Sequence, residues 1–248
     1  MESNFSFTPF AVARRLLSLF WAVVSTSIYG IAVIVSRFFS IQMPRRISRI
    51  WARQLLAVGG VHSRVRGLEK IDASGKYIFV SNHQSLLDIP CMLANMPLPL
   101  TFIAKKELFS VPIFGRGIKS LGHVCIDRSS PRKARESFTL AVERLQKEDI
   151  SLVIFPEGTR SVTGELGDFH RGSFTLAVES GLPVVPIAVV DTRKALPKNS
   201  MMIRSGEVAL VIGDPIENPK ALDKNALVEK TRVALAGLVG ESGRPQMA

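Results

Sequence analysis

The residues best suited to chemistry are a histidine and an aspartate five positions apart, in Asn82-His83-Gln84-Ser85-Leu86-Leu87-Asp88. Within one helix, five steps of about 100° would leave the two side chains roughly 140° apart. They can meet only if His83 lies in a turn before a helix and Asp88 lies in its first turns. An aspartate placed there fixes one ring nitrogen and leaves the other free to take a proton. The spacing therefore predicts a general base, although a capping histidine beside a surface aspartate would give the same pattern.

A second segment with chemical potential is Phe155-Pro156-Glu157-Gly158-Thr159-Arg160-Ser161. Gly158 permits an unusual backbone angle or a close approach to a ligand. The guanidinium of Arg160 offers a planar fork of donors that suits a phosphate group. The segment predicts a phosphate-binding loop, and the alternative is a plain turn with a surface arginine.

Short apolar runs with strand character precede both segments, and helical patterns separate the runs. Strands alternating with helices predict an α/β domain with a mixed, largely buried β-sheet flanked by helices. Because Pro186 interrupts one run, that strand is expected near a sheet edge or a bulge. The predicted strands are 61–67, 77–80, 151–155, 184–190 and 207–212, with another strand within 118–126, and the predicted helices are 86–93, 131–145, 173–180 and 218–237.

The N-terminal region carries an uncharged stretch of 21 residues, Leu16–Ser36, which is the length a helix needs to cross a bilayer. It continues into Phe38-Phe39 without a small-residue cleavage site, which disfavours a signal peptide. The stretch could span the membrane once, or form a hairpin in one leaflet with Ile47–Val58 as an amphipathic second arm. A buried helix of a soluble protein is the third possibility.

Positive charge is concentrated around this stretch. Residues 1–66 contain nine arginines and one acid, which supplies eight of the eleven net positive charges. A basic block that flanks an apolar run favours an anionic membrane surface as partner. No nucleic-acid partner is expected, because no RNA-recognition signature or zinc-finger spacing is found. The two cysteines, Cys91 and Cys125, lack metal-ligand spacing, so reduced thiols and no metal site are expected.

These patterns divide the chain into three parts. Residues 1–58 are expected to form a membrane-binding helical segment with an N-terminal membrane-associated helix. Residues 59–240 form the α/β domain, and residues 241–248 are expected to be a flexible tail.

Four segments in this order resemble the conserved blocks of the glycerolipid acyltransferase family, which includes the 1-acylglycerol-3-phosphate acyltransferases. The first resembles that family's N-H-x-x-x-x-D block, and Phe155–Ser161 resembles its F-P-E-G-T-R-S block. The other two are Gly122–Arg128 and Val184–Val189. The resemblance covers about residues 77–190 and is specific in two blocks. Cys125-Ile126 stands where an aromatic or branched residue is usual, a mild departure.

The resemblance implies a role for each matching residue. His83 resembles the general base and Asp88 its orienting partner. The family's phosphate-binding loop corresponds to Glu157, Gly158, Thr159 and Arg160. Two further basic residues are implied near the acceptor, Arg128 and Lys105, with Lys106 able to replace Lys105.

The implied reaction transfers an acyl group from acyl-CoA or an acyl-carrier-protein thioester to the sn-2 hydroxyl of 1-acyl-sn-glycerol-3-phosphate, lysophosphatidic acid, giving phosphatidic acid. No other cofactor is implied, and the expected location is the cytoplasmic face of the inner or plasma membrane. Two alternatives stay open: an acyltransferase acting on another lysolipid, such as a lyso-ornithine lipid, and a catalytically silent lipid-binding protein.

Overall fold

A seven-stranded β-sheet forms the centre of the computed structural model, which describes residues 9–127 and 129–242. Neighbouring strands are parallel except β6 and β7, so the prediction of a mixed sheet is confirmed. In spatial order the strands are β1 Val61–Arg66, β7 Gly206–Ile212, β6 Val184–Val190, β2 Ile78–Ser81, β5 Ser151–Ile154, β3 Leu100–Ala104 and β4 Val124–Cys125.

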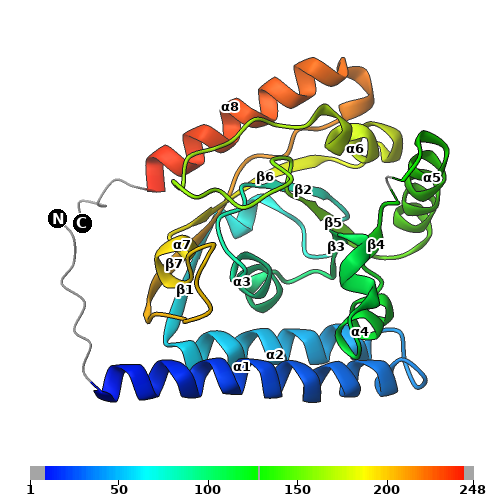
Figure 1. Ribbon diagram of the computed structural model, residues 1–248. Helices are drawn as coiled ribbons and strands as arrows, with labels where there is room; N and C mark the ends of the chain where they lie inside the picture. Colours follow the sequence, from blue (N-terminus) through cyan, green and yellow to red (C-terminus); the bar gives the residue numbers. More distant parts are fainter. Residues whose placement is uncertain (1–8, 128, 243–248) are drawn as a thin grey trace.

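Helices cover both faces of the sheet (Figure 1). On one face α3 lies between the sheet and the paired helices α1 and α2, and on the other lie α5, α6 and α8. Short 3₁₀ helices occupy Leu68–Lys70, Lys106–Ser110, Arg171–Phe174 and Pro219–Ala221. The α-helices are α1 Pro9–Ser36, α2 Met43–Gly59, α3 Asp88–Asn95, α4 Phe114–Ser120, α5 Pro131–Lys147, α6 Thr175–Ser180, α7 Thr192–Ala195 and α8 Lys224–Ser242.

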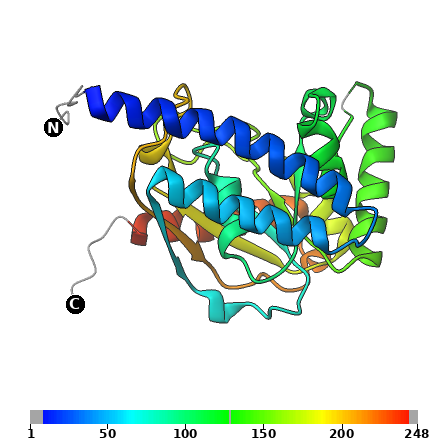
Figure 2. The same ribbon diagram turned by 90° about the horizontal axis from the view of Figure 1, so that it is seen from below.

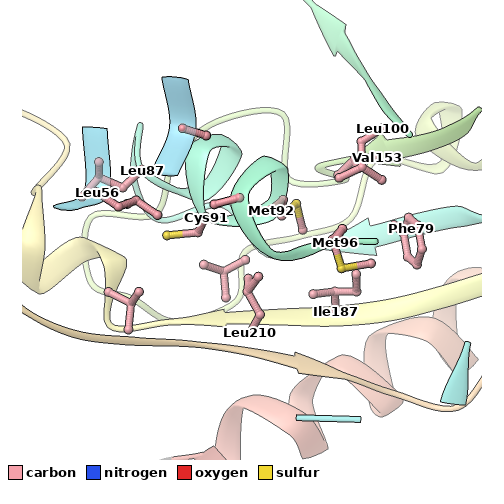
Figure 3. Packing of buried hydrophobic residues seen from close by; sticks show 14 of the residues in the cluster. Leu56, Phe79, Leu87, Cys91, Met92, Met96, Leu100, Val153, Ile187 and Leu210 are labelled. Carbon is pink, nitrogen blue, oxygen red and sulfur yellow. The ribbon is translucent and has the colours of Figure 1, made fainter. Parts of the chain in front are cut away.

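The central strands are apolar on both faces, because each face is covered by helices. In β2, Phe79 faces the core beneath α3, while Ile78 and Val80 face the core beneath α5, α6 and α8. Figure 3 shows the first of these cores, where Met92 of α3 and Met96, just after that helix, lie among residues of the sheet. The sheet therefore holds the loops that follow its strands in fixed positions.

The N-terminal region is a helical hairpin, and Figure 2 shows α1 and α2 side by side along one face of the domain. Helix α2 ends at Gly60, which adopts a left-handed conformation, and it contributes Ala52, Leu55 and Leu56 to the core. In contrast, only 17% of the apolar stretch Leu16–Ser36 is buried, which contradicts the reading of α1 as the core helix of a soluble protein. Large exposed apolar side chains of α1 are Leu16, Leu17, Phe20, Val23, Ile28, Ile31 and Val35.

The strand predicted within residues 118–126 is confirmed, but only over Val124–Cys125. Helix α4 continues to Ser120, and only Val124 and Cys125 pair with β3. Gly115 lets α4 begin close to the preceding 3₁₀ helix, because a Cβ at this position would lie 2.2 Å from the carbonyl oxygen of Phe109. The apolar pattern came from Ile118, which is buried from a helix rather than from a strand. The sequence analysis also did not predict β3.

The strand containing Pro186 was predicted to lie near a sheet edge or a bulge, and it does not lie at an edge. Strand β6 lies between β7 and β2. Pro186 falls in a gap of the antiparallel ladder, between the Ile187–Ile212 pair and the bridge from Val184 to Ile216. Its carbonyl still accepts a hydrogen bond from the Gly213 amide at 2.8 Å. The missing N–H is therefore tolerated in a central strand.

Several helix boundaries differ from the predicted ones. Helix α3 begins at Asp88 rather than residue 86, and the last helix begins at Lys224 rather than 218. Asn218 has a positive φ of 47° and leads into a short 3₁₀ turn, which delays the start of α8. Helix α8 then continues to Ser242, beyond the predicted end at 237. Residues 243–248 of the predicted tail lie outside the described residues.

Candidate active site

The candidate active site lies where several parallel strands end. Strands β2, β5, β3, β4 and β6 run in one direction, so their carboxyl ends meet at one edge of the sheet. His83 follows β2, the Phe155–Ser161 loop follows β5, and Lys105 follows β3. This is the edge at which α/β proteins usually bind their ligands. The topology thus brings the two chemically suited segments together.

His83 and Asp88 are in contact. His83 lies in the turn after β2, Asp88 is the first residue of α3, and His83 Nδ1 lies 2.7 Å from Asp88 Oδ2. This is the arrangement that the spacing required. With Nδ1 facing the carboxylate, Nε2 is the ring nitrogen available to a substrate. The catalytic role of the pair stays a prediction.

The carboxylate of Asp88 is held by backbone and side-chain donors. Its Oδ2 accepts hydrogen bonds from the amides of Gln84 at 2.7 Å and Ser85 at 2.9 Å. Its Oδ1 accepts one from the Thr192 hydroxyl at 2.5 Å. The Asp88 side chain is completely buried. A buried carboxylate with this many donors is held in one orientation beside the imidazole.

The imidazole of His83 also packs on an aromatic ring. It stacks on Phe155, with ring centroids 4.2 Å apart and planes inclined by 19°. The backbone of His83 is tied to the second segment, because its carbonyl accepts a hydrogen bond from the Ser161 amide at 2.7 Å. The two segments therefore form one unit around the imidazole, whose side chain is 18% exposed.

Glu157 connects the same two segments. Its Oε1 accepts a hydrogen bond from the His83 amide at 3.0 Å, and its Oε2 accepts one from the Gly167 amide at 3.1 Å. Burial raises the pKa of this carboxyl above its usual value, and the two backbone donors partly oppose that shift. Both oxygens are thus engaged by the chain, and the structure places Glu157 as a support for the loop.

The rest of the loop presents groups suited to an anion. Gly158 has a φ of +67°, and a Cβ there would lie 3.1 Å from the ring of His170. The Thr159 hydroxyl accepts a hydrogen bond from Lys198 Nζ at 3.2 Å. Arg160 is half-buried, and its buried Nη1 has no hydrogen-bond partner within the described structure. A buried guanidinium nitrogen without a partner is well suited to a negatively charged ligand.

The three basic residues expected near the acceptor differ in their surroundings. Lys106 Nζ lies 3.0 Å from Asp127 Oδ2, and this hydrogen bond raises the pKa of the Lys106 amine. Lys105 is exposed and has no side-chain partner in residues 9–127 or 129–242. Lys105 is therefore the lysine left free to bind a ligand. Arg128 lies outside the described residues.

Two supporting residues were not predicted from the sequence. Asn82 clamps the end of β2 to β6, because its side-chain amide exchanges two hydrogen bonds of 2.8 Å with the backbone of Val189. Thr192 approaches Asp88 from the end of β6. Thr192 carries no motif of its own, and its only signal is its place just after a buried parallel strand.

Several known proteins are similar to this chain. A family model described as Acyltransferase matches residues 62–190. The chloroplastic 1-acyl-sn-glycerol-3-phosphate acyltransferases of Arabidopsis thaliana and Brassica napus are 33% and 36% identical over 89% and 71% of this chain. This chain spans 64% and 51% of their lengths. The enzyme of that name from Pseudomonas aeruginosa is 34% identical, with 82% of this chain and 78% of the relative covered.

A solved structure extends the similarity to the whole described fold. The crystal structure of the 1-acyl-sn-glycerophosphate acyltransferase from Thermotoga maritima matches with a TM-score of 0.81 and 27% sequence identity. The match covers 95% of this chain and 99% of that one.

Proposed function

The chain belongs to the acyltransferase family, and we propose that it transfers a fatty acyl group from an acyl thioester to the sn-2 hydroxyl of 1-acyl-sn-glycerol-3-phosphate, giving phosphatidic acid. One observation carries this proposal: His83 and the buried Asp88 share a sheet edge with a loop in which Arg160 Nη1 has no partner among the described residues. The pair supplies a base for a hydroxyl, and Arg160 supplies a site for the phosphate of the same acceptor.

The proposed reaction needs no covalent enzyme intermediate, because a thioester is already activated. His83 Nε2 takes the hydroxyl proton as the acceptor oxygen attacks the thioester carbonyl. The tetrahedral intermediate then collapses, the carbon–sulfur bond breaks, and the imidazolium returns the proton to the leaving thiolate. Asp88 holds the ring in the required tautomer and stabilises the imidazolium.

The acceptor phosphate is proposed to bind Arg160, with Lys105 and Arg128 as further cations. Gly158 and Thr159 shape the loop in this proposal, and Glu157 anchors it to the His83 turn. A carboxylate with both oxygens engaged is a poor direct partner for a phosphate. Its role is therefore to position the loop rather than to contact the ligand.

Membrane association is proposed to occur through the hairpin, in one leaflet on the cytoplasmic side. Helix α1 is long and apolar enough to cross a bilayer, but it packs along α2, which is part of the domain core. A helix that spanned the bilayer would draw α2 and the domain into the hydrocarbon. An in-plane hairpin instead leaves the polar domain in water.

An acyl-transfer assay with the purified full chain tests the proposal. Lysophosphatidic acid should be preferred over lyso-ornithine lipid and lysophosphatidylcholine, with acyl-CoA and acyl-carrier protein compared as donors. His83→Ala should lower turnover by roughly 10²–10⁴-fold, the usual contribution of a general base. Exposed His62 on β1 provides the control, and His62→Ala should keep normal turnover. Normal turnover by His83→Ala would contradict the mechanism, and preference for another lysolipid would reassign the acceptor.

A further inference from the structure

A basic hollow of about 200 Å³ lies beside the turn between α1 and α2. We use the name basic hollow for the cavity lined by Arg37, Ile41, Arg45, Lys119, Arg144 and Glu148 together with adjoining backbone. Helices α4 and α5 supply Lys119, Arg144 and the neighbouring Glu148, while the hairpin supplies the others.

The basic hollow is separate from the candidate active site. Its lining includes Gly122 and Glu148, which come shortly before β4 and β5. His83 and Phe155 come after β2 and β5. Because these strands are parallel, the hollow lies at the amino edge of the sheet and the active site at the carboxyl edge. A ligand in the hollow therefore cannot be the reacting acceptor.

The charges around the hollow do not balance. Glu148 pairs with two of the four cations, Arg45 at 3.2 Å and Arg144 at 2.6 Å. Arg37 and Lys119 are exposed, and no hydrogen bond or ion pair joins their side chains to another side chain in the part of the chain that the structure describes. Arg37 acts on Glu148 and Arg45 only through its charge. Burial, and secondarily the charge of Arg144, lower the pKa of Arg45 despite the attraction of Glu148. An anion placed here would relieve crowded positive charge.

The surroundings of the hollow point to a lipid as the source of that anion. Phe38 and Phe39, in the adjoining turn, are 85% and 78% exposed, and Ile41 on the wall is 47% exposed. Large exposed apolar side chains continue along α1. An apolar turn that enters the acyl region would bring a cationic hollow to the level of the headgroups.

We propose that the basic hollow binds the phosphate of an anionic membrane phospholipid, with Arg37 and Lys119 as its free cations. Guanidinium and ammonium donors suit a phosphate, and the apolar turn suits the acyl chains of the same molecule. The site would anchor the hairpin end of the domain to an anionic bilayer. It does not rest on the proposed reaction.

Vesicle binding by the full chain tests this site. The variant Arg37→Gln/Lys119→Gln is compared with Arg46→Gln/Arg116→Gln, which removes two exposed charges from the same hairpin and α4 without altering the hollow. Both variants lose the general attraction of two charges. The Arg37→Gln/Lys119→Gln variant should bind phosphatidylglycerol-containing vesicles roughly tenfold more weakly than the control variant, because it alone loses charge-assisted hydrogen bonds to the phosphate. On pure phosphatidylcholine vesicles the two should be equal.

Additional measurements separate the possible outcomes. Arg37→Lys/Lys119→Arg should restore binding, and thermal melting should show that all variants fold. Equal weakening of the two neutralised variants would overturn the site. If calorimetry shows that glycerol 3-phosphate binds as tightly as short-chain phosphatidylglycerol, the basic hollow is a site for free phosphates. If the chain binds only an acidic carrier protein, the basic hollow is a protein-binding site. Turnover on detergent-dispersed substrate, measured in parallel, reports the proposed reaction separately.

Discussion

Thr192 donates a hydrogen bond of 2.5 Å to Oδ1 of Asp88, while Oδ2 of the same carboxylate faces His83. The two residues are 104 positions apart, and the bond connects the end of β6 to the start of α3. Every oxygen of the buried carboxylate is thereby oriented. Thr192 is thus a positioning residue for the proposed base.

We therefore expect Thr192→Val to lower kcat by roughly 10- to 150-fold, the equivalent of one hydrogen bond to a charged group, with little change in KM. Thr192→Ser keeps the hydroxyl and should keep most of the activity. Steady-state kinetics with urea unfolding of each variant measures this. If kcat falls as much in the serine variant as in the valine variant, the packing of the Thr192 methyl group matters and its hydroxyl does not.

Arg160 gives a prediction about affinity rather than turnover. Arg160→Ala should raise KM for lysophosphatidic acid by roughly 10- to 100-fold, since it removes a charge-assisted contact with phosphate, and should change kcat little. Arg160→Lys keeps the charge but not the fork and should be intermediate. Exposed Arg171 provides the control substitution. An unchanged KM in Arg160→Ala would reassign the loop.

His123 gives a prediction about stability at acid pH. Burial, with a smaller contribution from Arg144, lowers the pKa of His123 to about 4. Because the unfolded chain binds this proton at about pH 6.5, stability is fully present above that pH and is lost as the pH falls toward 4. The loss attributable to His123 is up to about 3 kcal/mol. Measured by urea unfolding from pH 7 to pH 4, the free energy of unfolding should fall less steeply for His123→Gln than for the unmodified chain. Equal slopes for the two proteins would contradict this assignment.

The exposed turn gives a prediction about membrane binding that is independent of charge. Phe38→Ser/Phe39→Ser should weaken binding to neutral phosphatidylcholine vesicles by tenfold or more, because burial of one such side chain contributes roughly 1.5–3 kcal/mol. Leu140→Ser/Val233→Ser changes two apolar side chains on α5 and α8 that are 66% and 62% exposed. This control should sediment with vesicles as the unmodified chain does. Equal losses would show that the hairpin turn has no special role.

Helix positions and the His83–Asp88 arrangement could be predicted from the sequence, because each depends on residues within one short segment. The length of Leu16–Ser36 indicated a helix, and Ser130 before Pro131 indicated the start of α5. The angular argument for His83 and Asp88 required a turn followed by a helix start, and the structure has that arrangement. The extent of the strand within residues 118–126 could not be predicted, because buried helices and buried strands share the same short apolar runs.

The sequence by itself determined the chemical types present: a histidine with an aspartate five residues on, an arginine in a glycine turn, and an apolar N-terminal helix. Only the tertiary structure decided which of them meet. Parallel β2, β5 and β6 deliver His83, Glu157 and Thr192 to one edge, and no local pattern encodes contacts between residues about 70 to 110 positions apart. The basic hollow likewise exists only because α4, α5 and the hairpin pack together, since side-chain periodicity reports a buried face but not the element that covers it.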